Sequence, residues 1–530
     1  MSTTLAGTRP LFKVSLRQDV HNIAPWVMLI SALSVSSILA YAWIFPDAED
    51  RAALAATLGA NPALSLVFGP ARDLSTADGF NAWRAGALGA FFAGLMAVLI
   101  VVRNSRANED SGQAELVASG VLARESRLAV ALLMAALASV ALGVVSWVLT
   151  VVCGGGLTST LFLSATFTAS GLMFAGVAAV AAQLGADARA ASSLGVGTLG
   201  VCYVLRGYLD SSGAPDWTTW LTPLGWLEEV APATDNNPWP LLVAVAFAAL
   251  LVRLAFGLQA RRDFGQGLIA TRPGPPEARL AATVWGFALR LHRPSIIAWL
   301  VAFTGLGLLF GNLASSVGDL IASNPSIGAV IASGAASPAD FSFAFLVTIL
   351  QIVAIIAAVM GVQVVLRIHA EEIDFRVEPL LAGSLRRTTY LASNAVIAFA
   401  GPAIGLFVAG VGMGLVAAAR DDSIAMLDVV KQALVTVPAT WTLVALALAA
   451  VGAAPSKRLV AWAGVVATFG LTILGPTFNL PDWALDVSPL HHVPNVTAAS
   501  PDWTGLVWLF GFVVLFCVVG FVGFRRRDIQ

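Results

Sequence analysis

Long uninterrupted runs of apolar residues constrain this chain more than any other feature of its sequence. A helix that crosses the hydrocarbon core of a bilayer needs about 20 apolar residues, and runs of this kind recur throughout the 530 residues. Because lipid offers no hydrogen bonds to the backbone, such runs predict membrane-spanning helices. Twelve spans are expected, near residues 24–45, 84–102, 128–152, 160–184, 191–207, 238–259, 295–316, 343–366, 389–417, 432–453, 459–478 and 504–524.

The composition agrees with a chain whose main solvent is lipid. Apolar residues make up 58% of the sequence and charged residues only 12%, whereas an average soluble domain has roughly 25% charged residues. A formal net charge of -1 argues against a nucleic-acid partner, which requires a concentrated basic surface. The three cysteines lie in or beside apolar runs without metal-ligand spacing, so we interpret them as packing residues and expect no metal site.

Basic residues are distributed unevenly among the predicted loops, and this distribution sets an orientation. Arginine and lysine collect in the loops after spans two, six, eight and ten and after the last span, where Arg525, Arg526 and Arg527 follow one another. Loops rich in these residues are retained in the cytoplasm. The opposite loops are acidic or neutral. We therefore expect a multi-pass protein of the inner (plasma) membrane with both termini in the cytoplasm.

The second half of the sequence repeats the first half in order. The matches include Glu109 with Glu372, Glu115 with Glu378, Gly120 with Gly383, Arg124 with Arg387, and Arg262 with Arg527. They predict an all-α polytopic membrane protein built as two parallel six-helix repeats, 1–265 and 279–530, joined by a cytoplasmic linker at 266–278. An even number of spans gives both repeats one orientation, so a pathway between them is expected.

Two predicted cytoplasmic segments, after spans two and eight, share a pattern of charges. Each contains acidic residues, a further Glu, a short apolar stretch, a Gly and an Arg. The residues are Glu109, Asp110, Glu115, Gly120 and Arg124 in the first segment, and Glu371, Glu372, Glu378, Gly383 and Arg387 in the second. A single copy is better explained as a solvated helix end with internal ion pairs. Two copies in matching register favour a surface that docks a protein partner.

At these residues the sequence resembles the permease subunit of type-two ATP-binding-cassette exporters, and most closely the fused polyketide-antibiotic (tetronasin-like) exporters of actinobacteria. The resemblance covers the whole chain. It implies that the two segments are coupling helices that dock into ATPase subunits, and that interfacial elbow helices lie at about 8–22 and 279–293. The second segment departs from the family pattern, with Asp374-Phe375 where the first has Ser111-Gly112.

No Gly-x-x-x-x-Gly-Lys-Ser/Thr run occurs in the sequence, so the chain is not expected to cradle ATP phosphates as a P-loop does. The expected protein is a transport subunit rather than an enzyme, with no cofactor bound by this chain. By the resemblance, two copies of an ATP-binding-cassette ATPase subunit would supply ATP and Mg²⁺ chemistry, one copy for each coupling segment.

The predicted spans contain few ionisable residues, which are costly at that depth. Polar candidates for a substrate path are Gln183, Gln351, Gln363, Trp217 and Trp483. The glutamines would either pack helices together or bind a ligand, and the tryptophans would form an interfacial belt or line an exit. A path rich in Phe, Leu and Val suits a hydrophobic or amphiphilic compound that enters from lipid, as in antibiotic or multidrug efflux.

Two other classes of protein remain alternatives. A proton-driven drug transporter would need buried carboxyl groups in the spans, and these are scarce. A membrane-embedded lipid-modifying enzyme would need a cluster of catalytic groups at one membrane face. The acidic loop with Asp216, Glu228 and Glu229 comes nearest to such a cluster, but the second half does not repeat its glutamates.

Overall fold

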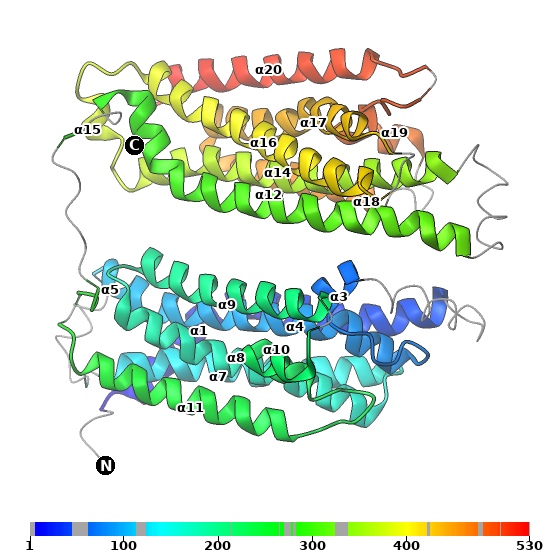
Figure 1. Cartoon of the computed structure of the whole chain (residues 1–530). Coiled ribbons are helices and arrows are strands. Elements are labelled where there is room, and N and C mark those ends of the chain that lie inside the picture. The colour runs from blue at the N-terminus through cyan, green and yellow to red at the C-terminus, as the bar shows by residue number, and fades with distance from the viewer. Residues whose placement is uncertain are drawn as a thin grey trace. The chain divides into compact units, whose positions relative to one another are not determined.

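The computed structural model describes residues 6–44, 62–112, 123, 125–212, 214–263, 265–269, 277–278, 282–323, 338–420, 424–474, 481–498 and 500–528. Within these residues the chain forms helices and connecting turns and no strands. It divides into two compact units, Met1–Gly274 and Pro275–Gln530 (Figure 1). In each unit the long helices run side by side as a bundle.

Eleven helices in the described part of the chain are long and apolar enough to cross a membrane, so the protein is a multi-pass membrane protein. In the first unit they belong to α1 (Thr8–Ile44), α4 (Ala77–Val102), α7 (Ser126–Val152), α8 (Leu157–Leu184), α9 (Ala188–Ser211) and α11 (Trp239–Gln259). In the second unit they belong to α12 (Val284–Ser323), α14 (Pro338–Ile373), α16 (Arg387–Ala418), α17 (Met426–Ala453) and α20 (Thr504–Arg526). The predicted span at 459–478 overlaps α18 (Leu459–Leu474), and residues 475–478 lie outside the described part.

Shorter helical elements lie at the ends of the long helices. They are α3 (Pro62–Phe68), η2 (Arg103–Ala107), α5 (Asn108–Asp110), η3 (Asp216–Leu221), α10 (Pro223–Glu228), α15 (Glu378–Leu381), η5 (Pro455–Lys457), α19 (Asp482–Leu485) and η6 (Pro489–His492). Several of them position the charged residues considered below.

The predicted elbow helices are not separate elements in the residues that the structure describes. Residues 8–22 are the first part of α1, and residues 284–293 are the first part of α12. Each helix continues through a proline, Pro25 or Pro294, close to the junction between the predicted elbow helix and the predicted span. A proline removes one backbone hydrogen bond, but long membrane helices tolerate this where neighbouring groups compensate. The boundary between elbow and span was therefore predicted wrongly.

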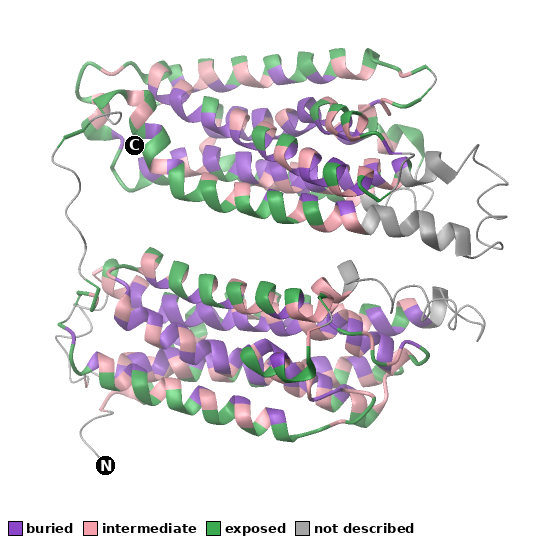
Figure 2. Ribbon diagram, in the orientation of Figure 1, coloured by how far each residue is buried: buried purple, intermediate pink, exposed green. Residues whose placement is uncertain are grey.

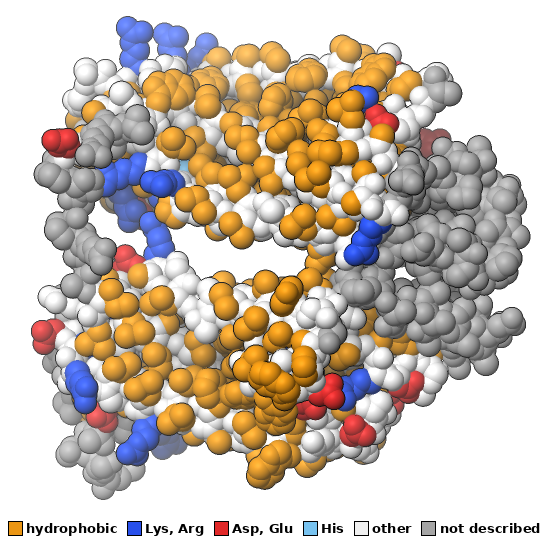
Figure 3. All heavy atoms as spheres, in the orientation of Figure 1, with side chains coloured by type: hydrophobic (Ala, Val, Ile, Leu, Met, Phe, Trp, Pro, Cys, Tyr) orange, Lys and Arg blue, Asp and Glu red, His pale blue; other side chains and the backbone are white. Residues whose placement is uncertain are grey.

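Burial identifies the central helix of each unit. In their most apolar stretches, 67% of α8 and 72% of α17 is buried, compared with 17% of α11 and 11% of α20 (Figure 2). Small residues permit this close packing, and a Cβ atom at Gly452 of α17 would clash with the backbone of Gly520 in α20. In the face drawn in Figure 3, hydrophobic side chains cover the middle of each unit and charged side chains lie towards its ends. Apolar outer faces of this kind suit contact with lipid.

The two units share one packing scheme. In the first unit α4 packs against α1, α7, α8 and α9, and α8 also packs against α7, α9 and α11. In the second unit α14 packs against α12, α16, α17 and α18, and α17 also packs against α16, α18 and α20. The first helix of each unit also packs against the third, as α1 with α7 and α12 with α16. Each of these helix pairs thus has a counterpart in the other unit.

Candidate functional site

A buried ion pair links the segment at the end of α4 to the residues that follow α11. Glu109 accepts hydrogen bonds of 2.7 and 3.0 Å from Arg262 and a further one of 2.7 Å from Arg106. Arg262 also donates to Gln183 at 2.7 Å, and Arg106 donates to the backbone carbonyl of Gly185 just after α8. The Glu109 side chain is only 6% exposed. The ends of α4, α8 and α11 are therefore joined through one carboxylate.

The second unit has the same arrangement. Glu372, near the end of α14, accepts hydrogen bonds of 2.6 and 2.7 Å from Arg527, which follows α20. The Glu372 side chain is 1% exposed, and Arg527 also donates to the backbone carbonyl of Gly452 at the end of α17, at 3.1 Å. Glu109 matches Glu372 and Arg262 matches Arg527 in the sequence. We call these two contacts the helix-end ion pairs.

The chain makes the same turn after each of these glutamates. The backbone N–H of Gly112 donates to the carbonyl of Glu109 at 3.1 Å, and that of Phe375 donates to the carbonyl of Glu372 at 3.0 Å. Gly112 has φ +74° and Phe375 has φ +55°. This left-handed conformation costs a side chain such as phenylalanine about 1–2 kcal/mol and glycine almost nothing. The turn is thus retained in the second unit even though the sequence departs from the glycine.

Several predicted docking residues bond within their own unit. Glu371 is buried and accepts hydrogen bonds from Arg367 at 3.0 Å and from Tyr390 at 3.4 Å. Asp110 is exposed, yet it accepts a hydrogen bond of 2.6 Å from the backbone N–H of Ala188 at the start of α9. Arg387 donates to the backbone carbonyl of Arg527 at 2.8 Å. Internal ion pairing, the alternative to docking, therefore accounts for part of the pattern.

Other residues of the second segment are exposed. Glu378 begins α15 and Gly383 follows it, and both are exposed. Ile373 and Phe375 are 53% and 65% exposed. The predicted docking residues Glu115, Gly120 and Arg124 of the first segment lie outside the described residues.

The five residues predicted for a substrate path have different surroundings. Gln183 belongs to the cluster around Arg262. On α14, Gln351 is half-buried and Gln363 is exposed. Trp217 in η3 and Trp483 in α19 are 65% and 74% exposed. None of the five lines the cavity described next.

A cavity lies in the first unit, towards the end of α4 opposite to Glu109. Its walls come from α3, α4, α8, α9 and α10 and from the segments beside them. Aromatic and apolar side chains form much of the lining, among them Phe68, Trp83, Leu163, Tyr203 and Leu224. The charged residues in the lining are Arg72, Asp73, Arg206 and Glu228.

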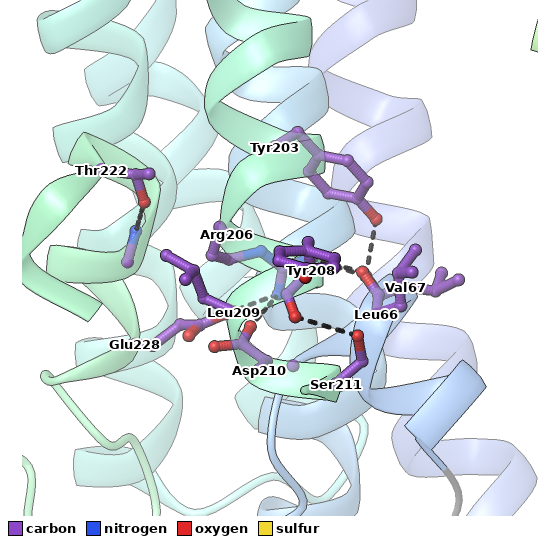
Figure 4. Close-up of polar contacts among 12 residues, drawn as sticks. Leu66, Val67, Tyr203, Arg206, Tyr208, Leu209, Asp210, Ser211, Thr222 and Glu228 are labelled. Carbon is purple, nitrogen blue, oxygen red and sulfur yellow. Dashed lines mark hydrogen bonds and ion pairs between the residues drawn. The ribbon is translucent and has the colours of Figure 1, made fainter. Parts of the chain in front are cut away.

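Arg206 is the centre of the polar wall (Figure 4). Its side chain is 1% exposed and donates to Glu228 at 2.5 Å. It also donates to the backbone carbonyls of Leu66 and Val67, each at 3.1 Å. The guanidinium lies 4.8 Å from the centre of the Tyr203 ring. This network joins α3, α9 and α10.

Two buried carboxyl groups share this one arginine. Asp210 lies 3.4 Å from Arg206, and its side chain is 8% exposed. One oxygen of Asp210 and one of Glu228 have no hydrogen-bond partner among the described residues, although the two carboxyl groups lie within hydrogen-bonding reach of each other. Burial raises the pKa of Glu228, while the positive charges of Arg206 and Arg72 oppose that shift. The pair is therefore suited to hold a proton or another cation.

Sequence reasoning noticed Glu228 as a loop residue and missed its buried partner. Arg206 lies at the end of the predicted span 191–207, and Glu228 lies in the loop that follows. An arginine at a span end, followed by a glutamate in the next loop, is the sequence pattern that could have indicated this ion pair. At the sequence offset of 266, the second half has Thr472 in place of Arg206 and Pro494 in place of Glu228. The charged cavity wall is thus a property of the first half alone.

Comparison with known proteins gives two matches. The family model described as "Multidrug efflux system permease Rv1217c, C-terminal domain" matches residues 24–259 and 282–525. The chain is also 34% identical over 531 residues to "Multidrug efflux system permease protein Rv1217c" of Mycobacterium tuberculosis (strain ATCC 25618 / H37Rv). That alignment covers 99% of this chain and 95% of the relative.

Proposed function

This chain belongs to the multidrug efflux permease family that Rv1217c represents, and we propose that it is the transmembrane permease subunit of an ATP-driven exporter of hydrophobic or amphiphilic compounds. Two copies of a separate ATP-binding-cassette ATPase subunit would bind and hydrolyse ATP. Each copy would dock on one of the two segments that follow α4 and α14. Family membership and the eleven apolar helices support a transport subunit rather than an enzyme.

The observation that carries this proposal is the recurrence of the helix-end ion pairs. Removing one partner of a buried ion pair costs about 3–5 kcal/mol, because the other charge is left buried and uncompensated. Each docking segment is therefore linked to the residues that follow the last helix of its unit, by Glu109–Arg262 in the first unit and by Glu372–Arg527 in the second. If the ATPase subunit displaces either segment, several helices would move together, as coupling to a separate ATPase requires. The matched pairs and the shared packing scheme also support an internal duplication.

The exposed part of the second segment supports the docking role. Ile373 and Phe375 present apolar surface beside the exposed carboxylates of Asp374 and Glu378. An apolar centre with a charged rim is typical of protein interfaces. We assign Glu115 of the first segment the same role as Glu378, because the two glutamates match in the sequence.

Transport by the reconstituted complex tests the proposal. The intact chain is placed in vesicles with and without its ATPase partner, and efflux of a hydrophobic fluorescent dye is followed. Export is expected only when the ATPase subunit and ATP are both present. Export by the chain alone, in vesicles without nucleotide, would contradict the proposal.

A proton-driven transporter is the second candidate, and one observation favours it. Asp210 and Glu228 are the buried carboxyl pair that such a protein would need. The same vesicles distinguish the two mechanisms, because a proton gradient without ATP would then drive export.

A further inference from the structure

We propose that the cavity of the first unit and an adjoining recess form a binding site for a bulky lipophilic cation. The assignment deepens the proposed function, since it names such cations as a class of compound that the exporter carries. The site comprises an apolar chamber and an acidic chamber that meet at shared residues.

The acidic chamber is a recess beside the cavity, at the ends of α9 and α10. Pro70, Arg72 and Glu228 line both this recess and the cavity, so the two spaces adjoin. The carboxylates that line the recess are Asp210, Asp216, Glu228 and Glu229. Arg72 neutralises one of them through a bond of 3.1 Å to Glu229.

The charges around the recess leave an excess of negative charge. Arg206 contacts both Glu228 and Asp210, so the four carboxyl groups of the recess share two arginines. Asp210 Oδ2, which lies 3.4 Å from Arg206, and Glu228 Oε2 have no further hydrogen-bond partner among the described residues. A ligand cation placed beside these carboxyl groups would be stabilised electrostatically, because two arginines do not balance four acidic side chains.

The apolar chamber suits the hydrophobic part of the same ligand. Phe68 and Trp83 pack with their ring centres 4.9 Å apart, and the indole N–H of Trp83 donates to the Gly69 carbonyl at 3.1 Å. Aromatic faces attract cations as well as apolar groups. Small residues of α4 leave the space open, since among the described residues a Cβ atom at Gly86 would meet only Leu163, at 3.8 Å.

The charged residues of the cavity wall are not repeated at the matching positions of the second half. The second unit pairs its long helices as the first unit does, but it has Thr472 and Pro494 at the sequence positions that match Arg206 and Glu228. A network kept in one unit, at the cost of burying two carboxyl groups, is better explained by a ligand than by structural support.

Binding of tetraphenylphosphonium to the purified intact chain tests the site. Equilibrium dialysis with the radiolabelled cation should show saturable binding, whereas the isosteric anion tetraphenylborate should neither bind saturably nor compete. Glu228→Gln removes the acidic contact, and Gly86→Leu fills the cavity without changing any charge. Each should weaken binding at least about tenfold, the loss expected for a charge-assisted contact or a blocked site.

Matched controls keep the result interpretable. Asp482→Asn removes an exposed acidic residue of α19 in the second unit and should leave binding unchanged, as should the small change Gly86→Ala. If Glu228→Gln does not fold, Gly86→Leu decides the question alone. Absence of saturable binding, or full binding by Gly86→Leu, would overturn the proposal. These measurements need no ATPase subunit, so cation binding without ATP-dependent export would reject only the proposed function.

Discussion

At the scale of single residues, matching charges in the two halves of the sequence proved to be partners within each unit. Glu109 and Glu372 were predicted to face another protein, but each binds an arginine in its own unit. Arg262 and Arg527 stood out in the sequence as basic loop residues that match each other, and not as partners of these glutamates. The order in which residues match between the two halves does not show which of them are in contact in the folded chain.

Loss of a helix-end ion pair should destabilise the chain. Glu372→Gln leaves Arg527 buried without its carboxylate, so we expect a loss of about 3–5 kcal/mol, seen as a clear fall in thermal unfolding temperature. The exposed Glu378→Gln is the matched control and should change the temperature little. The double exchange Glu372→Arg with Arg527→Glu should recover part of the loss. Equal unfolding temperatures for Glu372→Gln and Glu378→Gln would contradict the assignment.

The buried carboxyl of Glu228 should make stability depend on pH. Its pKa is raised above the ordinary value of 4.5 by burial, with Arg206, Arg72 and Asp210 as its charged neighbours. Below pH 4.5 both the folded and the unfolded chain carry the proton. As pH rises above that value, the unfolded chain releases its proton first, so the folded state binds more protons and stability falls. Thermal unfolding between pH 4.5 and 8 should show this fall, and Glu228→Gln should reduce its slope.

At the scale of elements, the turns after α5 and α14 show how one geometry tolerates two sequences. Gly112 adopts positive φ without strain, whereas Phe375 adopts it at a cost and presents a ring that is 65% exposed. A strained, exposed aromatic residue is a reasonable marker of function. The apolar runs predicted the positions of eleven long helices, but they predicted neither the full lengths of several of them nor the continuity of α1 and α12 through their prolines. Packing against neighbouring helices overrides the local preference there.

Replacing Phe375 should separate stability from coupling. Phe375→Gly removes the backbone strain, so the thermal stability of the chain should be kept or raised by about 1 kcal/mol. The same change removes the apolar surface offered to the ATPase, so substrate-stimulated ATP hydrolysis by the complex should fall.

Gly112→Ala is the matched control at the other turn. It should cost about 1 kcal/mol because of its positive φ, since no atom of the described residues lies within 4 Å of the added Cβ. Unchanged hydrolysis in Phe375→Gly would argue against contact with the ATPase.

At the scale of the whole molecule, two units with one packing scheme carry different charges at one end. Each unit retains its helix-end ion pair, and only the first has the Arg206 network. Coupling should therefore depend on both units, whereas cation binding should depend on the first. This division predicts that mutations in docking segments and in the cavity have separable effects.

Charge reversal in the docking segments should uncouple ATP hydrolysis from export. Glu378→Lys places a positive charge on an exposed surface that is proposed to meet the ATPase, and Glu115→Lys does so at the matching sequence position. Insertion and thermal stability should be preserved in Glu378→Lys, because its side chain is exposed. ATP-driven dye efflux by the complex, with tetraphenylphosphonium binding measured in parallel, checks this. Normal efflux in both variants would count against the docking assignment.

The sequence by itself determined where apolar helices lie and which residues correspond between the halves, because span length and residue order are local properties of the chain. Only the tertiary structure decided which charges are paired. The partners in the helix-end ion pairs are 153 and 155 residues apart, and Arg206 meets Glu228 after the chain has turned between α9 and α10. Whether a glutamate faces an arginine, a cavity or a partner protein depends on how the helices pack. The local sequence pattern does not encode contacts between residues that lie so far apart in the chain.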